Sequence, residues 1–370
     1  MSKNRKTEHS KNMKVFMLIR FLDYSGAPTM FMWVAEALHR KGHEVRICTW
    51  NTFRTDIKMS EGIKWVDLTP EKNGMVGRVK RIREEIRDFN PDVSVSFQLD
   101  ANVYNIIACR GLRTKSVVCE RNDPYKPGYY KLKVLKPVFS YADGAVFQLP
   151  KARGYYSNIK VPTVIIPNPI VSKTDVRCES HEKRKHVIAA HGRIDLFQKR
   201  QDVLVDAFAM LVKDYPDYQL QMYGSQWPGT NDEERLKEQI IRLGLECKAH
   251  LMGVSKNPQQ DIKDAMMWVS TSDFEGISNA LMDAMAIGIP VVATDCSPGG
   301  AAFLIKNKKN GLLVERGNAE AVYEGMKYMI EHPNEADEMG RKAVEIEKEL
   351  DSEKIAKQWE DYLLTLCNKN

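Results

Sequence analysis

The sequence predicts an α/β protein built from two doubly wound domains, each with a parallel sheet between layers of helices. Its 370 residues exceed what one hydrophobic core ordinarily holds. Short apolar strands alternate with amphipathic helices in both halves, a pattern typical of parallel sheets with right-handed crossovers. Three prolines within residues 161–169, followed by the charged residues 172–185, separate the two series and indicate a domain boundary.

The first series begins with an apolar strand at residues 14–19, which is followed by a helix predicted over residues 29–41. One apolar face of that helix is formed by Phe31, Val34, Ala35 and Leu38, and Gly42 ends it. Further strands are predicted at residues 44–49, 92–97 and 116–120, with a second helix at residues 78–89.

The second series begins with a strand at residues 186–190. The helix predicted over residues 201–214 has one apolar face, made by Leu204, Val205, Phe208 and Leu211. The other predicted elements are strands at residues 218–223, 249–252, 268–271 and 290–294, and helices at residues 233–243 and 279–286. Residues 335–366 have the pattern of an amphipathic helix too long to serve the second sheet alone.

Four parts follow from this pattern. Residues 1–12 form a disordered basic tail, residues 13–168 and 169–350 form the two domains, and residues 351–370 form a helix that packs back on the first domain. The first 168 residues carry 29 Lys and Arg against 16 Asp and Glu, a net charge of +13, whereas the others carry a net charge of −7. This asymmetry favours an anionic partner for the first domain, and a solvated surface is the equally open alternative.

Composition and motifs exclude several function classes. The chain is 43% apolar and 28% charged, as soluble globular proteins are, and its apolar runs fall far short of the ~20 residues of a membrane-spanning helix. The seven cysteines form no CxxC pair, so reduced thiols are expected and no metal site. The absence of GxGxxG and GxxxxGKS/T loops argues against nicotinamide enzymes and P-loop NTPases, and no nucleic-acid partner is expected.

A diphosphate site is predicted in the loop after the first strand of the second half. Gly192 permits a sharp turn, Arg193 follows it, and Lys199 precedes the next helix. A guanidinium fork and an ammonium group that converge on a helix N-terminus suit a diphosphate. An ordinary surface pair is the alternative interpretation.

Residues 272–290 combine a strand end, a glycine loop and a helix whose first amides would be free. Glu275 lies in the loop, and Asp283 lies about one turn into the helix. Free amides favour phosphate, and a carboxylate on either side suits hydroxyl groups, so the segment fits a nucleoside diphosphate sugar. The alternative is that Glu275 caps the helix and Asp283 is solvated.

Together these motifs resemble those of the retaining GT-B glycosyltransferases of family 4. Glu275-x7-Asp283 corresponds to that family's E-x7-E signature, and Gly192-Arg193 with Lys199 corresponds to its Gly-Arg…Lys motif. Further matches in the family's order are Ser-Gly-Ala-Pro at 25–28, Pro-Asn-Pro at 167–169, Tyr-Gly-Ser at 223–225, Leu-Met-Gly at 251–253, Gly-Ile-Pro-Val-Val-Ala-Thr-Asp at 288–295, Ser-Pro-Gly-Gly at 297–300 and Asn-Gly-Leu-Leu-Val at 310–314. The resemblance covers roughly residues 13–366.

The resemblance implies a GT-B fold, in which the two domains face a central cleft and the C-terminal helix returns to the first domain. It implies that Arg193 and Lys199 bind the donor diphosphate, that Glu275 holds the transferred sugar, and that Asp283 bonds the ribose. The donor sugar would also be lined by Gly276, Ile277, Ser278 and Asn279, and the donor-side loops would contain Gly26, Gly192, Gly253, Gly299 and Gly300. Asp283 replaces the family's second Glu and is one methylene shorter, so its ribose contact goes through a water or needs a closer helix.

The expected activity is that of a metal-independent hexosyltransferase that needs no cofactor. Such an enzyme moves a hexose or N-acetylhexosamine from a nucleotide sugar, most commonly a UDP-sugar, with retention of configuration. In the family that the sequence resembles, the departing diphosphate itself takes the acceptor proton, and the resemblance implies that Arg193 and Lys199 stabilise its charge. A non-catalytic nucleotide-sugar-binding protein and a nucleotide-sugar epimerase are the alternatives on this fold.

The first domain is expected to bind the acceptor, a polysaccharide or a lipid-pyrophosphate-linked saccharide. The acceptor candidates, which follow strand ends, are Gln98, Asn102, Glu120 and Arg121; capping or structural roles are the alternative. Residues 125–136 mix aromatic side chains with four lysines, which favours contact with an anionic membrane surface or, equally, a solvated helix. The protein is therefore expected in the cytoplasm, with the inner face of the plasma membrane as a surface that it could contact.

Overall fold

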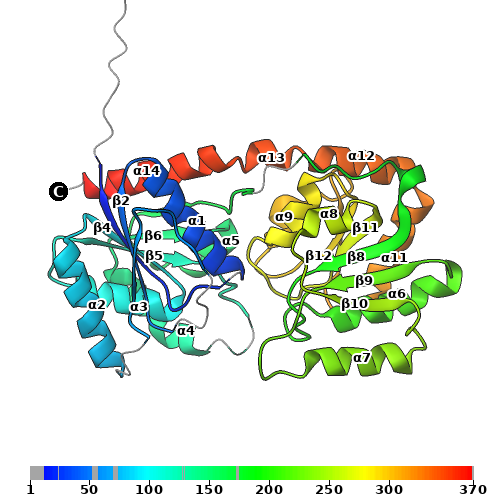
Figure 1. Cartoon of the computed structure of the whole chain (residues 1–370), viewed down its shortest axis with the longest axis horizontal. Helices are drawn as coiled ribbons and strands as arrows, with labels where there is room; N and C mark the ends of the chain where they lie inside the picture. The colour runs from blue at the N-terminus through cyan, green and yellow to red at the C-terminus, as the bar shows by residue number, and fades with distance from the viewer. Residues whose placement is uncertain are drawn as a thin grey trace, which may run out of the picture. The chain divides into compact units, whose positions relative to one another are not determined.

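The computed structural model describes residues 12–23, 25–51, 57–69, 74–126, 128, 130–171 and 175–368 (Figure 1). The predicted basic tail lies outside them, apart from Asn12. The chain divides into two compact units. Where described, unit 1 comprises Met1–Arg121, Tyr129–Ile166 and Glu353–Asn370, and unit 2 comprises Asn122–Gly128 and Pro167–Ser352. The chain passes from unit 1 to unit 2 between Ile166 and Pro167, two residues before the predicted boundary at 168/169.

Unit 1 holds a parallel sheet whose described strands have the order β3-β2-β1-β4-β5-β6-β7. The strands are β1 Lys14–Leu18, β2 Glu44–Thr49, β3 Lys64–Asp67, β4 Val93–Phe97, β5 Lys115–Glu120, β6 Gly144–Phe147 and β7 Thr163–Ile165. The helices are α1 Gly26–Arg40, α2 Met75–Phe89, α3 Leu99–Cys109, α4 Tyr130–Leu135, α5 Pro150–Tyr155 and α14 Ser352–Cys367, with a 3-10 helix, η1, at Lys136–Tyr141.

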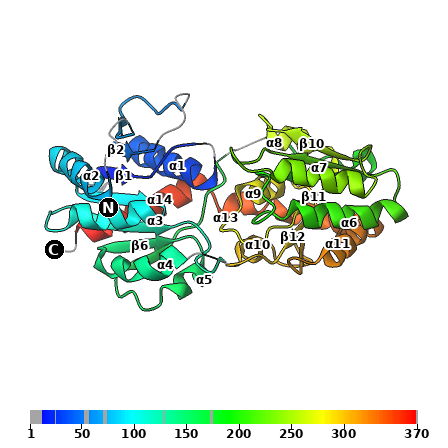
Figure 2. The ribbon, with the colours of Figure 1, turned by 90° about the horizontal axis from the view of Figure 1, so that it is seen from below.

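The central strand β1 shows why helices cover both faces of this sheet (Figure 1, Figure 2). Its side chains alternate between the faces, as in any strand. Val15 and Met17 lie in a core shared with α1 and with Trp359 of α14. Phe16 and Leu18 lie in a second core with α2 and α3. All four side chains are fully buried, so a helix layer is needed on each side.

Unit 2 holds a parallel sheet whose described strands have the order β10-β9-β8-β11-β12-β13. The strands are β8 Lys185–His191, β9 Gln219–Tyr223, β10 Ala249–Gly253, β11 Ala265–Ser270, β12 Val291–Thr294 and β13 Leu312–Val314. The helices are α6 Gln201–Asp214, α7 Asp232–Arg242, α8 Pro258–Ile262, α9 Asn279–Ala286, α10 Gly300–Leu304, α11 Ala319–Glu331, α12 Pro333–Ala343 and α13 Ile346–Glu349, with a 3-10 helix, η2, at His181–Lys183.

The prediction of two doubly wound parallel sheets is confirmed, because the strand order reverses at β1/β4 in unit 1 and at β8/β11 in unit 2. The single long helix predicted over residues 335–366 is wrong. The chain forms α12, α13 and α14 instead, and the interruption has a backbone cause. The Leu350 carbonyl accepts a hydrogen bond from the Ile170 amide at 2.9 Å, and Asp351 forms a strand-like bridge with Ile170. None of the helices within the described ranges has the length and hydropathy of a membrane-spanning segment.

α12 packs closely against the turn after α9, and a substitution at Gly340 of α12 tests this contact. A Cβ at Gly340 would lie 2.2 Å from the Gly288 carbonyl oxygen, whereas a Cβ at Gly154 of α5 would meet nothing within 4 Å. We expect Gly340→Ala to lower the free energy of unfolding by about 1–3 kcal/mol through overpacking. The matched change Gly154→Ala should be neutral or stabilising by up to ~1 kcal/mol. Urea unfolding measures both, and equal effects would contradict the close packing of α12.

Candidate functional site

The strand order of unit 2 brings two predicted motifs together. β8 and β11 are adjacent and parallel, and the order of strands reverses between them. Loops at such a switch point leave the sheet in opposite directions and open a crevice at its carboxyl edge. The loop after β8 carries Arg193 and Lys199, and the loop after β11 carries Glu275. Lys199 and Glu275, which are 76 positions apart in the sequence, meet at this edge.

Glycine contacts allow the loops at this edge to approach closely. A Cβ on Gly224 would lie 1.9 Å from the Gly192 carbonyl oxygen, and a Cβ on Gly300 would lie 1.8 Å from the Gly276 carbonyl oxygen. Gly192 and Gly224 also have φ values of +141° and +146°, which L side chains rarely adopt. The loops after β8, β9, β11 and β12 can therefore be this close only with glycine at these positions.

Lys199 and Glu275 form an ion pair. Lys199 Nζ lies 2.5 Å from Glu275 Oε1, and the side chains are only 14% and 17% exposed. The Ser272 hydroxyl donates to the other oxygen, Oε2, at 3.1 Å. The Thr271 hydroxyl donates to the carbonyls of Lys199 and Arg200, at 3.0 and 2.8 Å, and fixes the loop against the end of β11. The pair is thus held from both loops.

Arg193 is oriented by its own loop. Its Nε and Nη2 donate to Asp195 Oδ2 at 3.3 and 2.9 Å, and Nη2 also donates to Gln198 Oε1 at 3.0 Å. The guanidinium carbon lies 4.8 Å from the centre of the Trp227 ring. Within the described residues, Nη1 has no hydrogen-bond acceptor, so this nitrogen can bind an anion while the others hold the side chain in place.

The start of α9 offers backbone donors next to Glu275. Among the residues that the structure describes, no protein acceptor takes a hydrogen bond from the amides of Gly276, Ile277, Ser278 or Asn279. The Ser278 hydroxyl accepts from the Leu281 amide at 3.4 Å, so Ser278 is the N-cap of the helix. Asn168 donates to the Asn279 side chain and to the Ile277 carbonyl at 3.0 and 3.3 Å. This part of the loop is held by its side chains and carbonyls, and its amides remain available.

Asp283 lies in the first turn and a half of α9 and is largely buried. The alternative interpretation, a solvated side chain, does not fit this position. Burial raises the pKa of Asp283 to about 6, and a hydrogen bond from Gln259 Nε2, 3.4 Å from Oδ1, opposes this effect. A hollow beside it is lined by Asp283 and Gln259 together with Val176, Lys256, Asn257, Pro258 and Gln260. Sequence reasoning missed Gln259, because nothing in its local pattern marks it.

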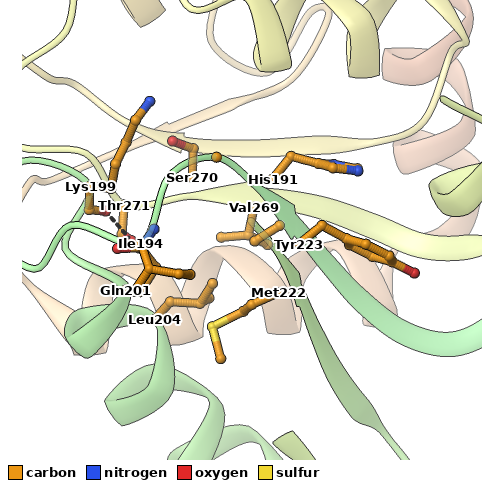
Figure 3. Close-up of a pocket in the computed structure, with 12 residues that line it drawn as sticks. His191, Ile194, Lys199, Gln201, Leu204, Met222, Tyr223, Val269, Ser270 and Thr271 are labelled. Atoms are coloured by element: carbon orange, nitrogen blue, oxygen red, sulfur yellow. Dashed lines mark hydrogen bonds between the residues drawn. The ribbon is translucent and has the colours of Figure 1, made fainter. Parts of the chain in front are cut away.

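His191 lies at the end of β8 and, like Lys199, lines the pocket of Figure 3. Lys199 and His191 extend to opposite ends of the labelled group (Figure 3). The Trp268 indole donates to His191 Nδ1 at 3.2 Å, and the imidazole stacks on Tyr223 with centroids 4.9 Å apart. Burial lowers the pKa of His191 to about 4. The imidazole is therefore neutral near pH 7, which fits a packing role better than a role in binding an anion.

In unit 1, Gln98 is the candidate whose geometry is unusual. It follows β4, has a φ of +77°, and its buried Oε1 has no hydrogen-bond partner among the described residues. Asn102 is fully buried instead: its amide donates to the Cys119 carbonyl at 3.0 Å and accepts from the Ser96 hydroxyl at 2.8 Å. Such a satisfied buried amide ties α3 to β4 and β5.

Glu120 and Arg121 are also buried within unit 1. The Tyr156 hydroxyl donates to Glu120 Oε2 at 2.5 Å. Arg121 lies over the rings of Phe97 and Trp359, 4.8 and 5.5 Å from their centres, and donates to the Ile166 carbonyl at 3.3 Å. Burial lowers the pKa of Arg121 to about 10. These contacts support the structural alternative for both residues.

The remaining predicted residues are glycines at element ends. Gly26 is the first residue of α1 in unit 1, and a Cβ there would meet nothing within 4 Å. Gly253 ends β10 with a φ of +74°, and Gly299 precedes α10 with a φ of +98°. Within the described ranges, no group of three or more His, Cys, Asp or Glu side chains could hold a metal ion.

Comparisons with known proteins identify a family model that matches most of unit 2. Residues 172–345, which make up most of unit 2, match the family model described as "Glycosyl transferases group 1". An uncharacterized glycosyltransferase of Methanocaldococcus jannaschii is 28% identical over 335 residues, which cover 76% of this chain and 81% of the relative. A Campylobacter jejuni protein, named as an alpha-1,4-N-acetyl-D-galactosaminyltransferase for a PP-undecaprenol-linked saccharide, is 22% identical over 358 residues, 94% of this chain and 97% of its own. The solved structure of Anabaena HepE with UDP superposes with a TM-score of 0.78 at 20% identity and covers 95% of this chain and 100% of that one.

The buried carboxyl group of Asp283 predicts a pH-dependent stability. Its pKa is raised from 3.8 to about 6, so the folded state binds more protons than the unfolded state between these values, and stability falls as the pH rises through this window. Asp283→Asn removes the charge and should stabilise the protein at pH 7.5 by about 2–3 kcal/mol. The gain should shrink steadily as the pH falls through 6 towards 4.

Urea unfolding at pH 7.5, 6 and 4.5 measures this difference. Asp175→Asn is the matched control, because Asp175 is an exposed carboxylate of the same unit. A gain at Asp283 that stays constant across the pH range would show that burial of its charge is not the cause.

Proposed function

We propose that the protein is a retaining, metal-independent hexosyltransferase, because residues 172–345 match the family model of the group 1 glycosyl transferases and the chain has the GT-B fold. It transfers a hexose or N-acetylhexosamine from a nucleotide sugar to a saccharide acceptor. The single observation that carries this proposal is the ion pair of Lys199 and Glu275 at the switch point of unit 2. A cation for the leaving group and a carboxylate for the sugar are adjacent there, as transfer from a nucleotide sugar requires.

The diphosphate of the donor binds to Lys199 and to Nη1 of Arg193, which has no acceptor among the described residues. Bond cleavage leaves negative charge on the diphosphate, and preorganised cations stabilise that charge where it develops. The amides at the start of α9 add donors at the positive end of a helix. The departing diphosphate takes the proton of the acceptor hydroxyl on the same face, so this mechanism needs no protein base.

The sugar and the nucleoside bind on the two sides of the diphosphate. Glu275 accepts hydrogen bonds from hydroxyls of the transferred sugar, and Asp283 accepts them from the ribose. Asp283 is one methylene shorter than the Glu of the family pattern, and Gln259 at 3.4 Å supplies a neighbouring amide on that side. The UDP in the Anabaena structure supports a uridine nucleotide as the donor.

The acceptor binds to unit 1, with Gln98 as the residue that contacts it. Gln98 is a non-glycine residue at φ +77°, and its buried amide oxygen has no partner in the described part of the chain. Binding sites often contain strained residues of this kind. The Campylobacter relative is named for a PP-undecaprenol-linked substrate, which supports a lipid-pyrophosphate-linked saccharide as the acceptor.

A peripheral contact with an anionic membrane surface fits such an acceptor. On α4, Tyr130 and Val134 lie one turn apart and are 72% and 75% exposed, and Lys131 and Lys133 are exposed beside them. Exposed apolar side chains flanked by lysines suit the headgroup region of a bilayer. Residues 127 and 129 of the predicted contact segment lie outside the described residues.

The donor reaction is tested by release of free nucleoside diphosphate from a panel of nucleotide sugars, with and without saccharide acceptors. Lys199→Ala should lower kcat about 100- to 1000-fold, because the charge on the leaving group loses its ammonium partner. Lys213→Ala, an exposed lysine in α6, should leave turnover unchanged. EDTA should have no effect. Donor binding without release of diphosphate would identify a nucleotide-sugar-binding protein instead, and loss of activity in EDTA would contradict metal independence.

The membrane contact is tested by flotation with liposomes. The double change of Tyr130→Ser and Val134→Ser should abolish flotation with vesicles that contain anionic lipid, because it removes the two exposed apolar groups of α4. Ile241→Ser, which changes an apolar side chain 60% exposed on α7, is the control and should float as the parent does. Equal flotation of the parent with neutral and anionic vesicles, or none with either, would rule this contact out.

A further inference from the structure

A short segment of the first half of the chain belongs to unit 2. Residues Asn122–Gly128 pack with unit 2, although β5, which precedes them, is part of unit 1. Asp123 of this segment is only 2% exposed. Charged side chains are buried this completely only where partners hold them, so the surroundings of Asp123 require an explanation.

The two oxygens of Asp123 differ in their partners. Oδ1 accepts a hydrogen bond from the Tyr125 amide at 2.8 Å, which closes a tight turn. Oδ2 is buried, and the described residues give it no hydrogen-bond partner. Burial raises the pKa of Asp123, while hydrogen bonds to its carboxyl group from the Tyr125 amide and the Ser297 side chain, and the charge of Arg316, oppose this effect. A buried acceptor without a donor costs free energy, so a missing donor is the natural explanation.

Ser297 connects Asp123 to the loop that carries Glu275. The Ser297 carbonyl accepts a hydrogen bond from the Glu275 amide at 2.7 Å, and the Ser297 amide donates to the Asp273 carbonyl at 3.1 Å. Ser297 also forms a strand-like bridge with Phe274. The Ser297 side chain acts as a hydrogen-bond donor that lowers the pKa of the Asp123 carboxyl group. One residue therefore separates Asp123 from the backbone of Glu275.

We propose that Asp123 is a second carboxylate for the transferred sugar of the donor. Its Oδ2 accepts a hydrogen bond from one ring hydroxyl, while Glu275 accepts one from another. This inference rests on the proposed function of Lys199 and Glu275. An ionised carboxylate accepts from hydroxyls and repels phosphate, so Asp123 contacts the sugar and not the diphosphate. A site built to bond a hydroxyl discriminates strongly against sugars that lack it, so Asp123 contributes to sugar specificity.

Kinetics with modified donors test this assignment. Asp123→Asn keeps the size of the side chain and the oxygen that accepts from Tyr125, and it replaces the acceptor for the hydroxyl with an amide. With the intact donor, kcat/KM should fall about 10- to 100-fold, as expected for a hydrogen bond to a charged group. With donors in which one ring hydroxyl of the sugar is replaced by hydrogen, one analogue should abolish the difference between parent and variant. Both have then lost the same hydrogen bond. Asp175→Asn is the control.

A binding measurement separates this role from a structural one. Thermal shift compares stabilisation by the intact donor with stabilisation by the nucleoside diphosphate alone. Asp123→Asn should keep the stabilisation by the nucleoside diphosphate and lose the additional part that the sugar provides. A variant that melts earlier but discriminates the analogues as the parent does would overturn the assignment. If Asp123→Asn does not fold, Asp123→Glu is assayed with the same analogues, and an unchanged profile overturns it equally.

Failure of this inference and failure of the proposed function give different results. A parent protein that neither binds nor turns over any donor of the panel contradicts both. An active parent, an inactive Lys199→Ala variant and an Asp123→Asn variant with the parent's selectivity contradict only the role of Asp123.

Discussion

The close contact of glycine backbones at the carboxyl edge of unit 2 is the constraint on which the candidate site depends. Gly224 touches the carbonyl of Gly192, and Gly300 touches the carbonyl of Gly276, at distances that exclude any side chain. A methyl group at either place would push apart the loops that carry Lys199 and Glu275. Their 2.5 Å ion pair and the Ser297–Glu275 hydrogen bond require the loops at this separation. The glycines therefore determine the geometry of the site, although they have no functional group.

Much of the fold and part of the site follow from local sequence pattern. The helices over 201–214 and 279–286 have the predicted bounds, because each has one clear apolar face and distinct ends. β3, β7 and α3 are among the elements that were not predicted: the two strands are short and half exposed, and the buried face of α3 includes the polar residues Asn102 and Asn105. The interruption before α14 depends on a backbone pairing with Ile170, a partner about 180 residues away, which no local pattern can indicate.

The site residues divide in the same way. Arg193, Lys199 and Glu275 stand in motifs whose spacing gives their positions at strand ends, so the sequence predicts where they lie. The residues that hold these side chains in place are harder to predict from the sequence. Asp195 and Gln198 share the loop of Arg193, but their hydrogen bonds with Arg193 depend on the conformation of that loop. Asn102, Glu120 and Arg121 also follow strand ends, yet they are buried. Position along a strand indicates the edge of the sheet, whereas burial depends on neighbours such as Trp359, which lies more than 200 residues further along the chain.

The ion pair of Lys199 and Glu275 has a consequence for donor and product. Both side chains are mostly buried, so removal of either partner leaves the other charge with too little solvation. When Lys199 binds the diphosphate, Glu275 loses its cationic partner and then needs other hydrogen-bond donors. The hydroxyls of an attached sugar supply them, and a free nucleoside diphosphate does not. The intact donor satisfies both groups at once, whereas the product satisfies only Lys199, so this pairing favours binding of the substrate and release of the product.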